Sequence, residues 1–281
     1  MDLTYTSLRS ARLSDILRQD MHLSAGLVNR LKWQQKLYVN GLPRHTDYPV
    51  SPGDEITVPM DDPVPQYPAE PGELSILYED DYLLAVDKPG GMLIHPSRSQ
   101  LTGTLANRVL YHYQTTGQSC AFHPVTRLDR DTFGIVLLAK SSHVHALLQQ
   151  NPLTKRYRAL VYGGPKGDSG IIDAPIARRP LPSLLRFVDN SGKPSRTEFT
   201  VLSRAGDTTA LELTPVTGRT HQLRVHCAHI GCPILGDPQY GTEASLALSK
   251  ALGYTTQQLC ACSLDFPHPI TGAPIHLHTR L

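Results

Sequence analysis

A short charged loop ahead of an apolar strand is the clearest candidate for chemistry. In PVTRLDRDTFGIVLLAK (124–140), Arg127, Asp129 and Asp131 precede the apolar run 135–139. A polar loop held by a buried strand is a common way to fix a reactive carboxylate. Taken alone, these residues favour a plainer interpretation, in which Asp129 is a solvated turn residue or an ion-pair partner.

Paired carboxylates also suggest glycoside hydrolysis, which uses two of them on either side of the scissile bond. Asp129 and Asp131 are only two residues apart, and this spacing does not show that they face a common substrate. A glycosidase therefore stays an open but weak alternative.

Arginines and histidines crowd a second segment, TPVTGRTHQLRVHCAHIGCPILGDPQYG (214–241). They are Arg219, His221, Arg224, His226 and His229. Gly218 permits a tight turn, and Thr220 is predicted to cap the helix that follows. His226 and His229 have the i, i+3 spacing of a metal-ligand pair, but we find no HExxH motif or nearby carboxylate. Structural hydrogen bonding and RNA contact are the favoured interpretation, and no metal is expected.

The elements that must position these residues are mostly strands. Alternating or apolar runs predict strands at 75–78, 82–86, 135–139, 156–162, 197–203 and 210–213. Helical spacing is clear at 103–112, and Ser141 or Ser142 can cap a helix that runs to Gln150. There is no regular βαβ alternation and no glycine-rich phosphate loop. We therefore expect an α+β fold whose mixed, largely antiparallel sheet has a central cleft.

The first 60 residues predict a small α/β unit of their own. Apolar residues at helical spacing are Leu13, Ile16 and Leu17 in a first helix and Leu27, Val28 and Leu31 in a second. Ser24 is placed to cap the second helix. A short strand at 37–39 runs into the strong turn signal Asn40-Gly41, and residues 55–58 alternate like a strand. Residues 61–72 then hold four prolines without apolar periodicity, which predicts a linker to a second unit at 73–281.

Composition restricts the class of protein. Of 281 residues, 40% are hydrophobic and 19% are charged, which is typical of a folded chain. No apolar run approaches the roughly 20 residues that span a bilayer, and the start of the chain has no secretory pattern. Five scattered cysteines favour a reducing, cytoplasmic location over metal binding. The net charge of +2 says nothing by itself about nucleic acid.

Six blocks in order resemble RluA-type RNA pseudouridine synthases. They are DKPGGMLIHP (87–96), RLDRDTFGIVLLAK (127–140), KRYRALVYG (155–163), GKPSRTEFTVL (192–202), GRTHQLRVHCAHIGCPILGDPQYG (218–241) and LDFPHPITG (264–272). The resemblance covers about residues 73–281. Residues 10–60 are similar to the small RNA-binding domain named after the fourth protein of the small ribosomal subunit, here called the S-four-like domain.

The resemblance implies a reaction that needs no cofactor. Such an enzyme breaks the bond from ribose to uracil N1, turns the base and rejoins it through carbon 5. The Asp of the R-L-D motif, here Asp129, is expected to be essential, either as a nucleophile or as a base that removes a sugar proton. Both roles need an ionised carboxylate close to the substrate.

The resemblance also implies roles for the remaining site residues. Arg224 should pair with Asp129 and keep it ionised, and Tyr157 should stack on the uracil, although a core aromatic would look the same. Leu223 matches an apolar pocket position, and an ordinary core leucine would look identical. Arg127 is expected either to enter the RNA during base flipping or to contact a phosphate. Expected substrate contacts in the second segment are Arg219 and His221, and expected RNA contacts in the first unit are Arg12, Ser24, Arg30, Lys32 and Lys36.

Three positions depart from the family pattern. Thr126 stands where the family usually has His, Phe133 where it often has Ser, and Cys260 where it often has His. We expect the first two to alter loop packing or RNA fit, and the third to be a packing change.

The target and the activity leave alternatives open. Large-subunit ribosomal RNA is the first choice of substrate and transfer RNA the second. A non-catalytic RNA-binding protein that assists ribosome assembly is the alternative to an enzyme. We expect a cytoplasmic monomer that does not contact a membrane.

Overall fold

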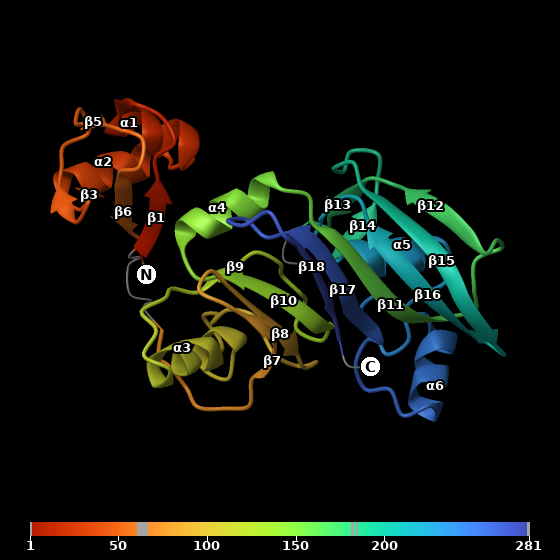
Figure 1. Cartoon of the computed structure of the whole chain (residues 1–281). Helices are drawn as coiled ribbons and strands as arrows, with labels where there is room; N and C mark the ends of the chain where they lie inside the picture. The colour runs from red at the N-terminus through yellow and green to blue at the C-terminus, as the bar shows by residue number, and fades with distance from the viewer. Residues whose placement is uncertain (1, 61–66, 181–182, 184, 280–281) are drawn as a thin grey trace.

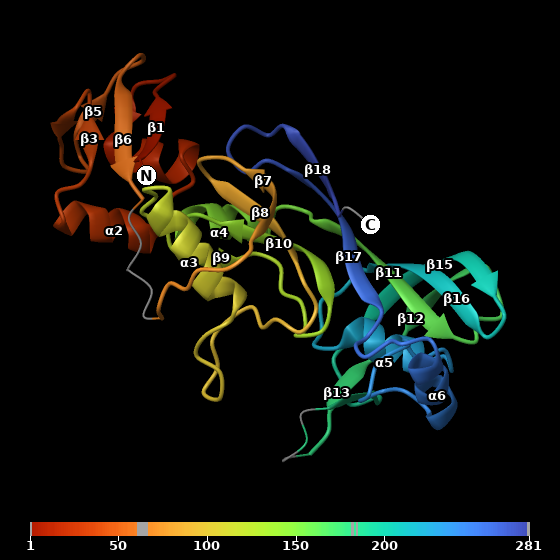
Figure 2. The ribbon, with the colours of Figure 1, turned by 90° about the horizontal axis from the view of Figure 1, so that it is seen from below.

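The computed structural model describes residues 2–60, 67–180, 183 and 185–279. Its secondary structure forms two main sheets, one built from residues before position 60 and the other from residues after position 74. In both Figure 1 and Figure 2 the smaller sheet lies at one end of the molecule, and strands β12, β15 and β16 lie at the other. Half of the predicted linker, residues 61–66, falls outside the described residues.

The first part of the chain is a small sheet packed on short helices. Its strands are β1 (Asp2–Thr6), β2 (Ala11–Arg12), β3 (Tyr38–Val39), β4 (Leu42–Pro43), β5 (Pro49–Val50) and β6 (Glu55–Pro59). Its helices are α1 (Leu13–Asp15), the π-helical turn η1 (Ile16–Asp20) and α2 (Ala25–Trp33). The sheet order is β1-β6-β3-β4, with β2 paired to β5. Strand β1 had no counterpart in the sequence prediction.

Local signals in this part act as predicted. Leu13, Ile16 and Leu17 are all fully buried, although the second turn of that helix is π-helical. The backbone N–H of Leu27 donates to Ser24 Oγ at 3.2 Å, which caps α2. The two residues of the 40–41 turn have φ of 52° and 75°, the left-handed values that a two-residue hairpin between β3 and β4 requires.

The second part carries the large sheet. Its strands are β7 (Ser75–Glu79), β8 (Leu83–Lys88), β9 (His123–Pro124), β10 (Phe133–Ala139), β11 (Thr154–Tyr162), β12 (Ser169–Asp173), β13 (Ile176–Arg178), β14 (Arg186–Val188), β15 (Arg196–Ala205), β16 (Thr208–Pro215), β17 (Leu259–Pro267) and β18 (Pro274–His278). Its helices are α3 (Leu105–Thr115), α4 (Ser142–Gln150), α5 (Gln222–His229) and α6 (Glu243–Ala251).

This sheet is ordered β12-β15-β16-β11-β17-β10-β8-β7, with β18 on β17 and β9 on β10. Its described pairings are antiparallel except β10 with β17. The fold is therefore α+β with a largely antiparallel sheet, as predicted.

Alternation along β8 and β10 builds two cores on opposite faces of the sheet. Val136 and Leu138 pack with α3, whereas Ile135 and Leu137 pack with α4. Figure 1 shows these two helices on either side of β10. A third core joins β11 and β16 to α5. The period-2 pattern of a strand buried on both faces explains why 135–139 reads as one apolar run.

The small sheet is not isolated from the large one. Tyr82 and Ile270, both from the second part of the chain, pack against the core formed by residues 3–60. Figure 1 and Figure 2 both show the first part of the chain at the end of the large sheet that β7 and β8 form. Apolar residues that lie before and after the Pro-rich stretch in the sequence therefore pack against one another.

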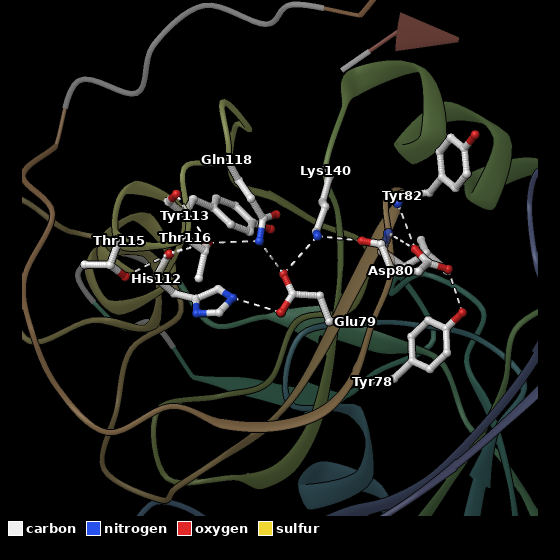
Figure 3. Close-up of polar contacts among 11 residues, drawn as sticks. Tyr78, Glu79, Asp80, Tyr82, His112, Tyr113, Thr115, Thr116, Gln118 and Lys140 are labelled. Carbon is white, nitrogen blue, oxygen red and sulfur yellow. Dashed lines mark hydrogen bonds and ion pairs between the residues drawn. The ribbon is translucent and has the colours of Figure 1, made fainter. Parts of the chain in front are cut away.

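A polar network ties α3 to the ends of β7 and β10 (Figure 3). The side chain of Lys140 is only 4% exposed, and its Nζ donates to Glu79 Oε1 at 2.8 Å. The same carboxylate contacts His112 Nε2 at 2.8 Å and Gln118 Nε2 at 2.9 Å. Glu79 and Lys140 also line a pocket of about 460 Å³. Lys140 follows the last residue of β10, whereas Asp129 precedes its first, so network and pocket belong to the opposite end of that strand.

Among the described residues, no helix has both the length and the apolar character needed to cross a bilayer.

Candidate active site

Asp129 lies in the loop between β9 and β10, and a buried lysine holds that loop. Lys88, which is fully buried at the end of β8, donates from Nζ to the carbonyl oxygens of Pro89 at 2.8 Å, Met92 at 3.0 Å and Arg130 at 3.0 Å. Burial lowers the pKa of Lys88 to about 8, although the nearby carboxylates Asp131 and Asp129 favour its charged form. Lys88 therefore places one positive charge directly under the loop that carries Asp129.

Both ends of this loop are fixed to neighbouring strands. At its start, the hydroxyl of Thr126 accepts from the backbone N–H of Leu137 at 2.9 Å, which gives this departure from the family pattern a structural role. At its end, Thr132 accepts from Gln257 Nε2, and both side chains are buried. The loop is thus held by hydrogen bonds before and after Asp129.

Gly134 lets strand β10 approach β17 very closely. Its φ is 106°, and a Cβ atom there would overlap the carbonyl oxygen of Ala261. Ala261 is the register partner of Gly134 on one side and of Tyr157 on the other. Adjacent strands lie about 4.8 Å apart, so Tyr157 lies about 10 Å across the sheet from Gly134 at the end where the Asp129 loop enters.

The structure brings Arg224 and Asp129 into direct contact. Arg224 Nη1 donates to Asp129 Oδ2 at 2.9 Å, across 95 residues of sequence. The arginine side chain is 7% exposed and the Asp129 side chain 29% exposed. A buried guanidinium thus meets a carboxylate that remains open to solvent, and therefore to a substrate.

A second carboxylate holds the other edge of the guanidinium. Asp237, which is fully buried, accepts from Arg224 Nε at 2.7 Å and from Nη2 at 2.8 Å. Burial by itself lowers the pKa of Arg224, but the hydrogen bonds and charges of Asp237 and Asp129 outweigh it and raise that pKa above its usual value. Arg224 therefore stays charged near neutral pH.

His221 and Tyr240 complete this side of the site. His221 Nδ1 lies 2.7 Å from Tyr240 Oη, and its Nε2 lies 3.8 Å from Asp129 Oδ2. Burial lowers the pKa of His221, so the imidazole is neutral near pH 7. Tyr240 Oη accepts from the backbone N–H of Arg186 at 3.0 Å, which leaves its own proton to donate to Nδ1 and places the imidazole N–H on Nε2, facing Asp129.

Tyr157, on β11, lies close enough to Asp129 for the charge of that carboxylate to act on its hydroxyl. Burial, followed by the negative charge of Asp129, raises the pKa of its hydroxyl above the usual value. The phenol is therefore neutral near pH 7 and keeps its proton.

The other expected substrate contacts are divided between the core and the surface. Leu223 is buried in the core below α5, together with Cys227 and Leu213. Arg127 is exposed. Arg219 is also exposed, and its Nε donates to the carbonyl oxygen of Pro194 at 3.3 Å. Arg127 and Arg219 are thus accessible to a polyanion, whereas Leu223 is mainly a core residue.

The start of α5 differs from the prediction. Thr220 does not cap the helix: the residue at the cap is His221, with φ of 57° and no side-chain cap hydrogen bond. A left-handed residue there turns the imidazole towards Tyr240 and Asp129. The Thr-based prediction failed because it considered only local capping chemistry.

Of the five residues expected to contact RNA in the first part of the chain, four are exposed and one is partly buried. Arg12 is an exposed residue of β2, Arg30 and Lys32 are exposed in the last turn of α2, and Lys36, partly buried, follows that helix. Ser24 is exposed, but its hydroxyl accepts the capping hydrogen bond of α2. Among the residues that the structure describes, no group of three or more His, Cys, Asp or Glu side chains is arranged to hold a metal ion.

Sequence reasoning missed four residues of this site: Lys88, Asp237, Gln239 and Tyr240. Lys88 lies in the block DKPGG and the other three in GDPQYG, so the blocks were noticed but the roles of these side chains were not. An aspartate between glycine and proline reads as a turn, and only the fold shows that it contacts Arg224.

Comparison with known proteins identifies the family to which the chain belongs. A family model described as RNA pseudouridylate synthase matches residues 82–229. The uncharacterized RNA pseudouridine synthase YlyB of Bacillus subtilis (strain 168) is 39% identical over 254 residues, which cover 88% of this chain and 82% of that protein. The ribosomal large subunit pseudouridine synthase D of Pasteurella multocida (strain Pm70) is 37% identical, covering 81% of this chain and 73% of that protein.

Solved structures agree in fold. Human RNA Pseudouridylate Synthase Domain Containing 1 superposes with a TM-score of 0.61 at 27% identity, covering 75% of this chain and 86% of that chain. The chain belongs to the RNA pseudouridylate synthase family and is an RNA pseudouridine synthase.

Proposed function

We propose that this enzyme converts specific uridines of large-subunit ribosomal RNA to pseudouridine, with Asp129 as the essential carboxylate. The observation that carries the proposal is the contact between Arg224 Nη1 and the accessible carboxylate of Asp129 at 2.9 Å. A loop carboxylate that is anchored by a buried cation yet open to solvent is suited to react with a bound nucleotide. The choice of RNA follows relatives named ribosomal large subunit pseudouridine synthase D.

The reaction needs no external group donor. The bond from C1′ to N1 breaks, the base turns, and a bond from C1′ to C5 forms. The proton that leaves C5 is balanced by the proton that N1 gains. We assign to Asp129 the attack on the substrate or the removal of a sugar proton, to Arg224 the orientation of that carboxylate, and to Tyr157 stacking and a late proton transfer.

We propose that residues 1–60 form an S-four-like RNA-binding domain, joined by 61–72 to a catalytic domain at 73–281. Its helix α2 ends with two exposed cations, Arg30 and Lys32, which suit phosphate contacts. Such contacts position a folded RNA without reading its sequence. In this proposal the enzyme acts as a cytoplasmic monomer.

The test uses RNA from cells that lack this protein. Pseudouridine is mapped chemically in total RNA, then mapped again after either the wild type or Asp129→Ala is restored. We expect one or more sites in large-subunit ribosomal RNA to vanish and to return only with the wild type. Loss of sites in transfer RNA alone would contradict the choice of substrate, and recovery with Asp129→Ala would contradict the role of Asp129.

A further inference from the structure

The carboxylate of Asp237 cannot contact a substrate, because the residue is fully buried. Its two oxygens hold two nitrogens of the Arg224 guanidinium, Nε at 2.7 Å and Nη2 at 2.8 Å. This is the fork-to-fork geometry of a strong arginine–carboxylate pair, which fixes the plane of the guanidinium as well as its position.

Two further residues, Gln239 and Tyr240, also hold the Arg224 guanidinium. Nη2 also donates to Gln239 Oε1 at 2.8 Å, and the ring centroid of Tyr240 lies 4.9 Å from the guanidinium carbon. Only Nη1 is turned towards the substrate side, where it meets Asp129. Rotating the guanidinium away from Asp129 would break both bonds to Asp237.

The loop that carries Asp237 is itself held in place. Asp237 Oδ1 accepts from the backbone N–H of Gln239 at 3.0 Å and of Tyr240 at 3.3 Å. Gly236 before it has φ of 74°, and a Cβ atom there would overlap the carbonyl oxygen of Thr256. The backbone around Asp237 therefore holds this carboxylate in position for its contact with Arg224.

We propose that Asp237 is a positioning residue, which fixes the guanidinium of Arg224 so that Nη1 orients the carboxylate of Asp129. The proposal rests on the catalytic role proposed for Asp129. The two carboxylates that contact Arg224 thus have different roles. The accessible carboxylate of Asp129 reacts, and the buried carboxylate of Asp237 orients the arginine. Partners that orient a group touching the reactive centre commonly matter almost as much as that group.

Two substitutions move the guanidinium in different ways. In Asp237→Asn, Oδ1 can still accept from the loop N–H groups, but the amide donor faces the Arg224 Nε–H donor. Asp237→Glu keeps the buried charge and shifts the fork by one methylene. The matched control is Glu79→Gln, which removes a carboxylate that holds the nearly buried Lys140 at the far end of β10.

Kinetics on an RNA that the wild type modifies give the first readout. Both Asp237 variants should lower kcat by about 10- to 100-fold, with KM unchanged, by analogy with the range typical of side chains that orient metal ligands. Glu79→Gln should lower Tm and leave kcat unchanged. Wild-type kcat in either folded Asp237 variant would overturn the proposal.

A double-mutant cycle shows whether Asp237 acts through Arg224. Adding Asp237→Asn to Arg224→Gln should cause no further loss of kcat, and it should raise Tm, because it removes a buried charge left without its partner. A second loss as large as that of Asp237→Asn alone would mean an independent role and would overturn the proposal.

Hydrogen exchange tests the geometry without any assay of activity. The Arg224 Nε–H, identified in nitrogen-15 NMR by its absence in Arg224→Gln, should exchange slowly in the wild type and in Glu79→Gln, and quickly in Asp237→Asn and Asp237→Glu. Fast exchange in the wild type, or equal protection in the variants, would overturn the positioning of Arg224. Activity that survives Asp129→Asn would instead refute the proposed function and leave this geometric result standing.

Discussion

His221 Nε2 lies 3.8 Å from Asp129 Oδ2, while the opposite ring nitrogen lies 2.7 Å from the hydroxyl of Tyr240. The backbone of His221 is left-handed, with φ of 57°. A non-glycine residue with this backbone at a site is a sign that the position of its side chain matters. The left-handed backbone of His221 and its hydrogen bond to Tyr240 thus hold the imidazole beside the carboxylate.

Replacing His221 by Asn should slow the reaction without unfolding the protein. Asn tolerates the left-handed backbone but cannot reach both Tyr240 and Asp129. The loss of about one hydrogen bond should lower kcat about tenfold, since ~1.4 kcal/mol corresponds to that factor. Single-turnover kinetics and a melting curve check this. An unchanged rate would contradict a role in the reaction, and an unchanged rate with a lowered Tm would show that His221 contributes only to folding.

Tyr157→Phe should keep stacking on the base and lose the hydroxyl. Because burial and Asp129 raise the pKa of Tyr157, the phenol stays neutral, and we expect its removal to lower kcat by about 10²-fold, as loss of a positioned proton donor does. RNA affinity and the shape of the pH profile up to pH 10 should not change. The control is Tyr162→Phe on the same strand. An alkaline limb present in the wild type and absent from Tyr157→Phe would contradict a neutral phenol.

Lys88 should make stability depend on pH in an unusual direction. Its pKa is about 8 in the folded protein and 10.5 as the ordinary value. Between these two values the unfolded chain binds one proton more, so the contribution of Lys88 to stability rises with pH. The wild type should gain about 1.4 kcal/mol of unfolding free energy per pH unit over Lys88→Met in this window, which is the limit for one proton. Urea unfolding at pH 7, 8, 9 and 10 measures the difference, and a flat or falling difference would refute the assignment.

The first part of the chain should supply RNA affinity rather than chemistry. Each phosphate contact contributes about 0.7–0.9 to the slope of log affinity against log salt, so Arg30→Gln with Lys32→Gln should reduce that slope by about 1.4–1.8. Trp33, the only tryptophan of the chain, ends the same helix, and its fluorescence reports RNA arriving there. Lys166→Gln with Lys250→Gln removes the same charge elsewhere. Equal slopes for the two pairs would contradict an RNA contact at α2.

These variants are preferable to deleting the first part of the chain. Tyr82 and Ile270 pack against its core, so a deletion would expose apolar surface on the remainder. A loss of affinity after deletion would then mix RNA contact with damaged folding.

Sequence patterns predicted the elements whose signal is local. The Asn40-Gly41 hairpin, the Ser24 cap and the strand at 135–139 all depend on neighbours in sequence, and all three are present. The parallel pairing of β10 with β17 depends on contacts between residues more than 120 positions apart, and it could not be predicted.

The site residues also divide into those with a sequence signal and those whose role depends on the fold. The family motif picked out Asp129, Arg224 and Tyr157, which the fold brings to one place. Asp237 was missed because its role depends on its burial and on its contact with Arg224, which lies 13 residues earlier in the sequence. The left-handed cap at His221 was missed because Thr220 offered a better local signal.

The most direct test of the account compares Asp129→Asn with Asp131→Asn, which remove neighbouring carboxylates of the same loop. Purified wild type and both variants are mixed in excess with an unmodified large-subunit ribosomal RNA transcript, and pseudouridine is measured after a single turnover together with RNA affinity. We predict product with the wild type and Asp131→Asn, none with Asp129→Asn, and equal affinity for all three. Pseudouridine formed by Asp129→Asn at the wild-type rate would contradict the central role of Asp129.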